Sequence, residues 1–440
     1  MSSLGRRKFL TLSASAAGSS CFLKACAPDF TAASSPTNSS AELIPATSPE
    51  PEEIKIGIIH SLSGAMAVTE APLVDAEKLA IAQINDSGGV LGKPLVPLIE
   101  DGASDWPTFA EKAEKLVNQE KVAVLFGGYT SASRKAMLPV VKAQNKLLWY
   151  PGNYEGQECS DHVFYTGATA NQQIEPAVNW ILGNRGKTFF LVSEGDRTTP
   201  DIVKGLLQKK GGKLAGEAYV PIKAGVNADM KPIVSDLKQA MPEGGIIFNS
   251  LLGNQNRTFF KELKSAGLPA YKYIVMSLHL TEAEVFQMGK EFFQGHYAIG
   301  SYFQSVEDAD AQAWTEAFQQ QFVADEAIGD SMAAAYTTVQ LWAKSVQQAQ
   351  TTGTQAVRAA AYGQSFKAPS GVVTLQTNHH LSKMVRIAKV TEGGRFEIVW
   401  QSPSPIHPNP WSQQLTETRG YACDWFDPQK GEQYLVEAST

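Results

Sequence analysis

Short apolar runs alternate with amphipathic stretches from Ile54 onward, and this alternation constrains the fold more than any other feature of the sequence. Continuous apolar runs are typical of buried strands, and apolar residues at helical spacing are typical of helices that cover a sheet. We predict strands at Ile54–Ile59, Leu95–Ile99, Val122–Phe126, Leu147–Tyr150, Thr188–Val192, Gly245–Phe248 and Tyr273–Met276. We predict helices at Ala71–Asn85, Pro107–Asn118, Gln173–Leu182, Asp201–Lys209, Ala228–Met241 and Asn254–Ala266. Because so many units exceed one sheet, the pattern predicts an α/β fold with two doubly wound parallel-sheet lobes.

The pattern changes beyond Phe303. Long helices are predicted at Asp308–Phe322 and Asp330–Ala349, followed by short strands at Val372–Leu375, Arg386–Val390 and Phe396–Trp400. From Pro403 the chain is rich in proline and aromatic residues. We expect residues 403–440 to pack across the surface as a tail without forming a further domain.

The segment LFGGYTSASRKAMLP, Leu125 to Pro139, begins at the end of one of these predicted strands. The apolar run stops at two glycines, hydroxyl-bearing residues come next, and a helical pattern then begins. Serine and threonine cap helices by accepting hydrogen bonds from unpaired backbone amides, and one such residue would suffice. The alternative is that the additional hydroxyls and the open amides hold a small polar ligand.

Ligands of open parallel sheets bind beyond the carboxyl ends of the strands. The segments directly after the predicted strands are rich in small, hydroxyl, amide and aromatic residues, and they are 60–64, 127–131, 151–155, 194–200 and 249–253. From them we take Ser63, Thr130 and Asn249 as candidate ligand contacts. Tyr154 is a further candidate, because tyrosine combines a flat face with a polar tip.

The sequence carries no recognisable catalytic motif. Gly88–Lys93 has the wrong spacing for a phosphate-binding loop, and Ser63 lacks the first glycine of a nucleophile elbow. His379 and His380 are adjacent without a carboxylate at metal-ligand spacing, so we predict a surface turn there and no metal site. The 440 residues carry a net charge of −6 with scattered Lys and Arg, which argues against nucleic acid binding. We expect neither enzyme activity nor a cofactor.

The first 53 residues are predicted to lie outside the fold. Arg6-Arg7-Lys8 precede a modestly apolar stretch, a layout typical of an export signal, which is either of the twin-arginine type that it resembles or a general one. Leu23-Lys24-Ala25-Cys26 resembles a bacterial lipobox, so we assign residues 1–26 to the signal and Cys26 to lipidation. The alternatives are lipidation at Cys21, which lacks a leucine three residues upstream, simple cleavage, or an uncleaved anchor. Residues 27–53, rich in Ser, Thr, Pro and Ala, are predicted to be a disordered tether. The folded part is therefore expected in the periplasm, held to the outer face of the cytoplasmic membrane through a lipid anchor only.

Two cysteines lie in the predicted folded part and its tail. Cys159 and Cys423 could pair in an oxidising periplasm, but a sequence gives no distance between them. An unpaired Cys159 or a buried pair of thiols fits the sequence equally well.

The stretch from IKIGIIHSLSG through IAQINDSGGVLGKPLVPLIEDGASDWPTFAEKAEKL resembles the extracytoplasmic substrate-binding proteins of the branched-chain amino acid and amide class. Within that class, the segments GGYTSASRKAMLPV, YEGQECSDHVFYTGATANQQIEPAVNWIL, PSGVVTLQTNHHLSKMVRIAKV and FEIVWQSPSPIHPNPW resemble the urea-binding component of an ABC importer. The resemblance covers Ile54 to about Trp411. It implies two lobes joined by a hinge of three strands that close over one small ligand. The expected lobes are 54–172 with about 304–345, and 173–303 with about 346–402.

The resemblance also implies site residues. Tyr129 and Ser131 match pocket positions after the third strand, and Tyr150, Gly152 and Asn153 match positions after the fourth. Asp196 matches the aspartate of the family segment Ser-Asp-Tyr-x-x-Pro on the second lobe. Three positions depart from the urea-binding pattern: Gly128-Tyr129 stands for Cys-Trp, Gly152-Asn153 for Val-Gln, and Arg197 for the tyrosine after the aspartate.

A dry site for urea must satisfy one acceptor oxygen and four N–H donors, because an unpaired buried polar group costs about 1–3 kcal/mol. Guanidinium would require two carboxylates, which Asp196 with Glu155 or Glu194 would provide, whereas Arg197 would oppose a cation if it points inward. The resemblance thus implies an extracytoplasmic protein that captures urea, a small neutral polar ligand, and delivers it to ABC permease subunits. The alternatives are another small amide, an amidine such as guanidinium, a branched-chain amino acid, or an amide sensor.

Overall fold

The computed structural model describes residues 53–195, 197–221, 228–322 and 327–436. The predicted export signal with Cys26, and the predicted tether up to residue 52, lie outside the described residues. Within the described part of the chain, no helix is both long and apolar enough to cross a membrane.

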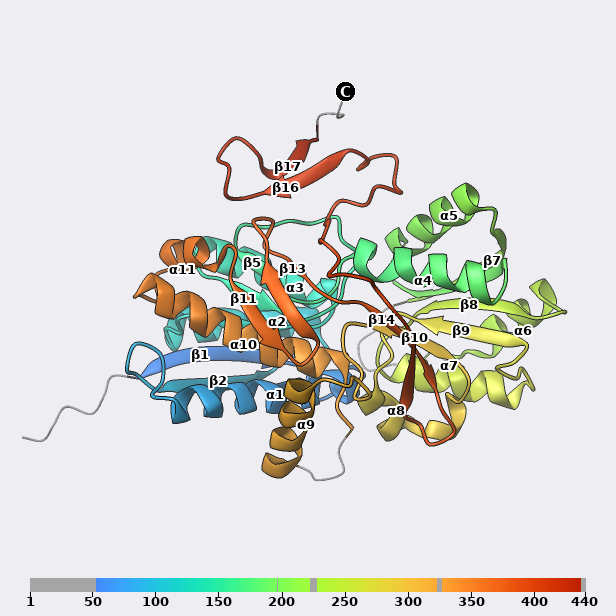
Figure 1. The fold of residues 1–440 in the computed structure, drawn as a ribbon, viewed down its shortest axis with the longest axis horizontal. Helices are drawn as coiled ribbons and strands as arrows, with labels where there is room; N and C mark the ends of the chain where they lie inside the picture. Colours follow the sequence, from blue (N-terminus) through green and yellow to red (C-terminus); the bar gives the residue numbers. More distant parts are fainter. Residues whose placement is uncertain (1–52, 196, 222–227, 323–326, 437–440) are drawn as a thin grey trace, which may run out of the picture. The chain divides into compact units, whose positions relative to one another are not determined.

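The first lobe is built on a parallel sheet with the strand order β2-β1-β3-β4-β5. Its strands are β1 (Ile54–His60), β2 (Leu95–Asp101), β3 (Leu125–Gly127), β4 (Leu148–Tyr150) and β5 (Val163–Tyr165). Its helices are α1 (Ala67–Asp86), α2 (Trp106–Glu114) with the single π-helical turn η1 (Lys115–Gln119), α3 (Ser131–Ala143), α9 (Ala309–Gln321), α10 (Asp330–Ala349) and α11 (Thr354–Ala361). Two apolar clusters fill the lobe, and α1 packs against α10 (Figure 1).

The second lobe is built on a sheet with the order β15-β14-β10-β9-β8-β6-β7, in which only the pairings of β14 are antiparallel. Its strands are β6 (Thr188–Glu194), β7 (Lys213–Val220), β8 (Gly245–Ser250), β9 (Tyr273–Ser277), β10 (Tyr297–Gly300), β14 (Arg386–Val390) and β15 (Phe396–Gln401). Its helices are α4 (Ala170–Asn184), α5 (Thr198–Lys210), α6 (Lys231–Ala240), α7 (Asn254–Ser265), α8 (Glu282–Met288) and the 3-10 turn η2 (Lys290–Phe292). Apolar clusters line both faces of this sheet.

The chain passes between the lobes three times along the described residues before the tail: after β5, after β10 and just before β14. Direct hydrogen bonds also link the lobes. Thr69 Oγ1 on α1 donates to Glu284 Oε1 on α8 at 2.5 Å, and Gln173 Nε2 on α4 donates to the Tyr154 carbonyl at 3.2 Å. The two-lobe α/β architecture predicted from strand–helix alternation is therefore confirmed.

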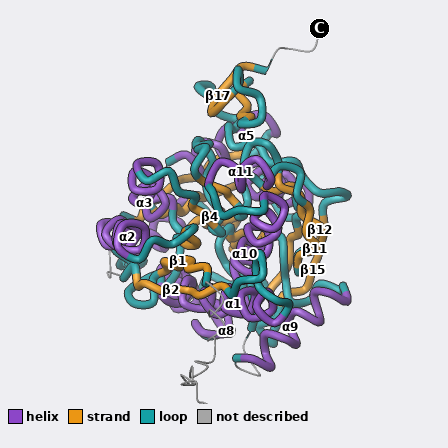
Figure 2. The backbone as a smooth tube through the Cα atoms, turned by 90° about the vertical axis from the view of Figure 1, so that its left-hand side faces the viewer, coloured by secondary structure: helices purple, strands orange, loops and turns teal. Residues whose placement is uncertain are grey.

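A small antiparallel sheet corrects one predicted boundary. It contains β11 (Ser365–Ala368), β12 (Gly371–Leu375) and β13 (Leu381–Ser382). The prediction placed residues 346–402 in the second lobe, but Val373, Leu375 and Leu381 pack into the first-lobe core, and β11 lies beside α10 (Figure 2). The apolar side of this sheet is buried by α10, so only the residues from β14 onward join the second lobe.

The tail after β15 ends in a hairpin, β16 (Tyr421–Asp424) with β17 (Gly431–Leu435). Cys423 of β16 forms a disulfide with Cys159, whose Cα lies 6.5 Å away. Both sulfur atoms are buried in a small cluster with Trp411. The sequence left open whether these cysteines are bonded, and in the structure they form a disulfide.

A buried ionic cluster lies at the end of β1. The His60 ring is fully buried, with Nε2 3.2 Å from Glu77 Oε1 and Nδ1 3.6 Å from Glu70 Oε2. Burial alone would lower the pKa of His60, but Glu77 and Glu70 outweigh it and raise the pKa to about 9. The imidazolium is therefore the form that holds the two carboxylates of α1 against β1.

Replacing His60 with glutamine is expected to lower the free energy of unfolding at pH 7 by about 3 kcal/mol, because two buried carboxylates lose their cation. In the parent protein the pKa is about 9 in the fold against ~6.5 in the unfolded chain. The stabilisation is thus complete below pH ~6.5 and is lost as the pH rises through 9. Thermal unfolding between pH 6 and 10 measures both effects, with H407Q, at an exposed histidine, as the control. A parent melting temperature that does not fall toward pH 10 would contradict the assignment.

Candidate functional site

A cavity of about 250 Å³ is lined by both lobes. The first lobe contributes residues 129–132, Lys135 and 153–155, and the second contributes Gln173, Glu194, Gly195, Thr199, Ser250, Leu252 and His279. Most of these residues come after the carboxyl ends of β3, β4, β6, β8 and β9, where ligands of parallel sheets bind. We call this cavity the candidate cleft.

The hydroxyls after β3 have different tasks. Thr130 is the N-cap of α3, and its Oγ1 accepts from the Ser133 amide at 3.0 Å. Ser131 Oγ instead donates to Glu155 Oε2 at 2.6 Å. Capping thus accounts for Thr130, whereas Ser131 orients a carboxylate that lines the candidate cleft.

A buried arginine organises the wall behind these residues. Arg134 is fully buried, and its Nε and Nη2 donate to the two oxygens of Glu158 at 2.8 and 3.2 Å. Its guanidinium lies 4.8 Å from the ring centroid of Tyr150 and 4.6 Å from that of Tyr154. Burial alone would lower the pKa of Arg134, but Glu158 outweighs it and keeps the group charged.

The adjacent histidines do not form the surface turn that we predicted. His379 and His380 are both fully buried, and burial lowers the pKa of each to about 3, so both rings are neutral. His380 Nε2 lies 2.5 Å from the hydroxyl of Tyr154, and its ring stacks on Tyr165. The prediction was wrong because these residues lead into β13, which packs against the first-lobe core. Among the described residues, no group of three or more His, Cys, Asp or Glu side chains is arranged so that it could hold a metal ion.

Five of the ten candidate ligand contacts line the candidate cleft, and they are Tyr129, Thr130, Ser131, Asn153 and Tyr154. Ser63 is exposed instead and donates to Asp101 Oδ2 at 2.7 Å. Asn249 is used inside the second lobe, where its amide nitrogen donates to Asn256 and Ser277. Asp196 lies outside the described residues.

Tyr150 and Gly152 lie behind the cleft wall. The Tyr150 hydroxyl donates to the Tyr129 carbonyl at 2.5 Å. A Cβ atom on Gly152 would stand 2.3 Å from the same carbonyl, so the close approach of the backbone requires glycine there. Both residues therefore support Tyr129 without lining the cavity.

The second-lobe wall presents hydrogen-bond acceptors. Glu194 Oε2 accepts from the Leu252 amide at 3.0 Å, and burial raises the pKa of Glu194 to about 7. Gln173 is 3% exposed, and its Oε1 has no hydrogen-bond partner among the described residues. Arg197 does not line the cavity, because its guanidinium lies over the ring of Tyr219 at 4.5 Å.

Sequence reasoning missed Lys135, Gln173 and His279 as cleft residues. Lys135 lies one helical turn after Ser131, so it shares the face of α3 that Ser131 presents. His279 comes shortly after β9, and the rule used for the other strands would have found it. Gln173 gave no comparable signal, because it begins a predicted helix and the strand before it, β5, was not predicted.

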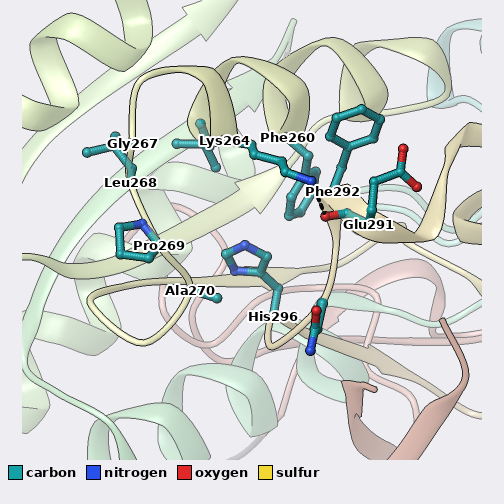
Figure 3. Close-up of a pocket in the computed structure, with 11 residues that line it drawn as sticks. Phe260, Lys264, Gly267, Leu268, Pro269, Ala270, Glu291, Phe292 and His296 are labelled. Atoms are coloured by element: carbon teal, nitrogen blue, oxygen red, sulfur yellow. Dashed lines mark hydrogen bonds between the residues drawn. The ribbon is translucent and has the colours of Figure 1, made fainter. Parts of the chain in front are cut away.

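A separate pocket lies in the second lobe at the amino ends of β9 and β10 (Figure 3). Lys264 donates to the Glu291 carbonyl at its edge, and His296 Nδ1 accepts from the Val275 amide. Phe260, Leu268 and Pro269 give it largely apolar walls. It is at the end of the sheet opposite to the candidate cleft and contains none of the predicted site residues.

Residues 54–417 match the family model described as "Periplasmic binding protein domain". The chain belongs to this family. Among curated proteins, the periplasmic binding protein is 32% identical over 123 residues to a limonene hydroxylase of Geobacillus stearothermophilus. It is 31% identical over 91 residues to the Leu/Ile/Val-binding protein homolog 7 of Brucella melitensis. These matches cover 28% and 21% of the chain, and each covers 23%, about a quarter, of the relative's length.

Solved structures share the fold at low identity. A periplasmic binding protein of Burkholderia mallei has a TM-score of 0.72 at 20% identity, over 83% of this chain and 98% of that one. A solute-binding protein of Rhodopseudomonas palustris in complex with 4-hydroxybenzoate has a TM-score of 0.73 at 19% identity, over 81% and 98%. The branched-chain amino acid transporter substrate-binding protein of Streptococcus pneumoniae, in complex with isoleucine, has a TM-score of 0.70 at 19% identity, over 81% and 100%.

Proposed function

We propose that this periplasmic binding protein captures urea in the candidate cleft and delivers it to the permease subunits of an ABC importer. The observation that carries the proposal is the set of acceptors around the cavity. Glu155 from the first lobe faces it together with Glu194 and Gln173 from the second. A ligand whose surface consists mostly of N–H donors would satisfy these groups.

Urea has such a surface, with four N–H donors around one oxygen. The Oε1 of Gln173 supports this choice, because a buried acceptor without a partner gains most from a donor in the ligand. Lys135 and the open amides at the start of α3 would serve the urea oxygen. Tyr129 and Tyr154 would supply flat faces for a planar molecule.

Guanidinium is the second candidate ligand. Two carboxylates, Glu155 and Glu194, line the cavity, and Arg197 is held over Tyr219 away from it. A carboxylate ligand such as leucine or 4-hydroxybenzoate would face these same acidic groups with Lys135 as the cationic partner. The acceptors therefore favour N–H-rich ligands over anionic ones.

The transport role is inferred from family membership and from the two-lobe design. Ligand bound between two lobes favours the closed arrangement, which a permease would recognise, so no chemical step is needed. Export and lipidation at Cys26 would keep the protein at the outer face of the cytoplasmic membrane. These same signals favour an importer over an intracellular amide sensor. Turnover of a bound amide, seen as released ammonia, would instead indicate an enzyme.

Isothermal titration with urea, acetamide, guanidinium, leucine and 4-hydroxybenzoate tests the proposal. We expect 1:1 binding of urea and none of the two carboxylates. Binding of guanidinium alone would move the assignment to a cation. Binding of leucine or 4-hydroxybenzoate without urea would contradict the ligand and leave the transport role standing.

A further inference from the structure

The tail does more than cover the surface. After β15 it leaves the second-lobe sheet, and Lys383 pairs with Ile406 in an isolated β-bridge. The Pro410 carbonyl then accepts from the Gln157 amide at 2.7 Å, and the chain reaches Cys423, which is bonded to Cys159. We call residues 403–425 the strap.

The strap is attached to the first lobe at the loop that carries cleft residues. Residues 151–160 have no helix or strand, and they include Asn153, Tyr154 and Glu155 of the candidate cleft. A loop without regular structure depends on outside contacts for its conformation. The strap supplies such contacts at Gln157 and at Cys159, on the segment directly after the cleft residues.

The same strap is attached to the second lobe. Gln414 Nε2 donates to Glu175 Oε1 on α4 at 3.1 Å, and Lys209 Nζ on α5 donates to Gln414 Oε1 at 2.6 Å. Leu415 packs into the apolar cluster that contains Ile202 and Leu206 of α5. One short segment therefore contacts both lobes beside the hinge, with a covalent bond at one end and a polar and apolar attachment near its middle.

We propose that the strap, locked by the Cys159–Cys423 disulfide, holds the cleft loop in its ligand-binding conformation and limits how far the two lobes open. Opening moves α4 and α5 relative to the first lobe, so it must stretch the strap or detach Gln414 and Leu415. The part of this proposal that concerns ligand affinity rests on the proposed function. The part that concerns loop order and lobe opening does not.

The test uses the full chain without ligand, so it is independent of the identity of the solute. In C159S/C423S, hydrogen exchange of the amides in 151–160 is expected to accelerate at least tenfold, while α7, whose buried side chains lie in the other apolar cluster of the second lobe, keeps its rates. In Q414A, small-angle X-ray scattering is expected to show a larger radius of gyration, because the two hydrogen bonds from Gln414 to α4 and α5 are lost. Gln429→Ala, at an exposed glutamine in the β16–β17 turn, is the matched control.

Loop exchange that is unchanged in C159S/C423S would overturn positioning by the disulfide. Scattering of Q414A that matches that of both the parent and Q429A would overturn the proposal that the strap limits lobe opening. If C159S/C423S does not fold, L415A joins Q414A, and unchanged scattering and unchanged loop exchange in both would decide against the proposal. If a solute is known, it is expected to dissociate several-fold faster from Q414A than from the parent protein. If the variants change loop exchange and scattering as expected but the protein binds none of the tested solutes, only the proposed function is contradicted.

Discussion

Replacing Arg134 with methionine is expected to destabilise the protein by about 3–5 kcal/mol, since it removes one partner of a buried ion pair and leaves Glu158 without its cation. Arg134 is fully buried, and three tyrosine rings surround its guanidinium. With an unfolding entropy of about 2 cal/mol/K per residue, this loss corresponds to a melting temperature about 4–6 °C lower. Scanning calorimetry is the suitable measurement, because the usual denaturants, urea and guanidinium, are themselves candidate ligands.

The Arg134 variant should also lose ligand affinity, because Nη1 of Arg134 donates to Ser131 Oγ, which in turn orients Glu155. R134K keeps the charge but not the planar fork that bonds both Glu158 oxygens, so an intermediate loss is expected. R134M/E158M removes both charges and should recover part of the stability. A double variant less stable than R134M would show that the ion pair is not the cause.

Much of the fold was predictable because its cause is local. Strands such as Ile54–His60 are predominantly apolar runs, and helices such as Asp330–Ala349 repeat apolar residues at helical spacing. The boundary at residue 346 was not predictable in this way. Short strands such as β12 have an apolar side that either lobe would bury, and only the packing against α10 decides between them.

The candidate cleft was predictable to the level of strand ends. Segments after β3, β4, β6 and β8 do line it, but the segment after β1 does not, because Asp101 draws Ser63 away from the cavity. Side chains within one segment also have different roles, and residue spacing does not show which of them line the cavity. Tyr150 and Tyr154 are close in sequence, yet only Tyr154 lines the cavity while Tyr150 supports it from behind. Ligand contact by the cleft-lining residues stays a prediction.

Replacing Glu194 with glutamine is expected to weaken ligand binding at pH 8 by about ten- to hundredfold, the value of a hydrogen bond to a charged group. Burial raises the pKa of Glu194 to about 7, and the Leu252 amide is the donor that opposes this rise. The ionised carboxylate is thus costly in the empty cleft above pH 7, and N–H donors from a ligand would offset that cost. Affinity of the parent protein should therefore rise about tenfold from pH 6 to pH 8.

The sign of this dependence distinguishes two roles of Glu194. If the carboxylate accepts from the ligand, binding lowers its pKa and releases a proton near pH 7, so the titration heat depends on the ionisation enthalpy of the buffer. Glu284, with a pKa of about 7, and Glu282 and Lys383, with pKa values of about 8, also titrate in this range. E194Q leaves Glu284, Glu282 and Lys383 in place, so it should abolish the proton release only if Glu194 is the source of the proton. E155Q should weaken ligand binding but leave the proton release unchanged. Affinity that falls between pH 6 and 8 in the parent and not in E194Q would mean that the protonated acid donates to the ligand oxygen, and that the cleft is built for an acceptor rather than for the donors of urea.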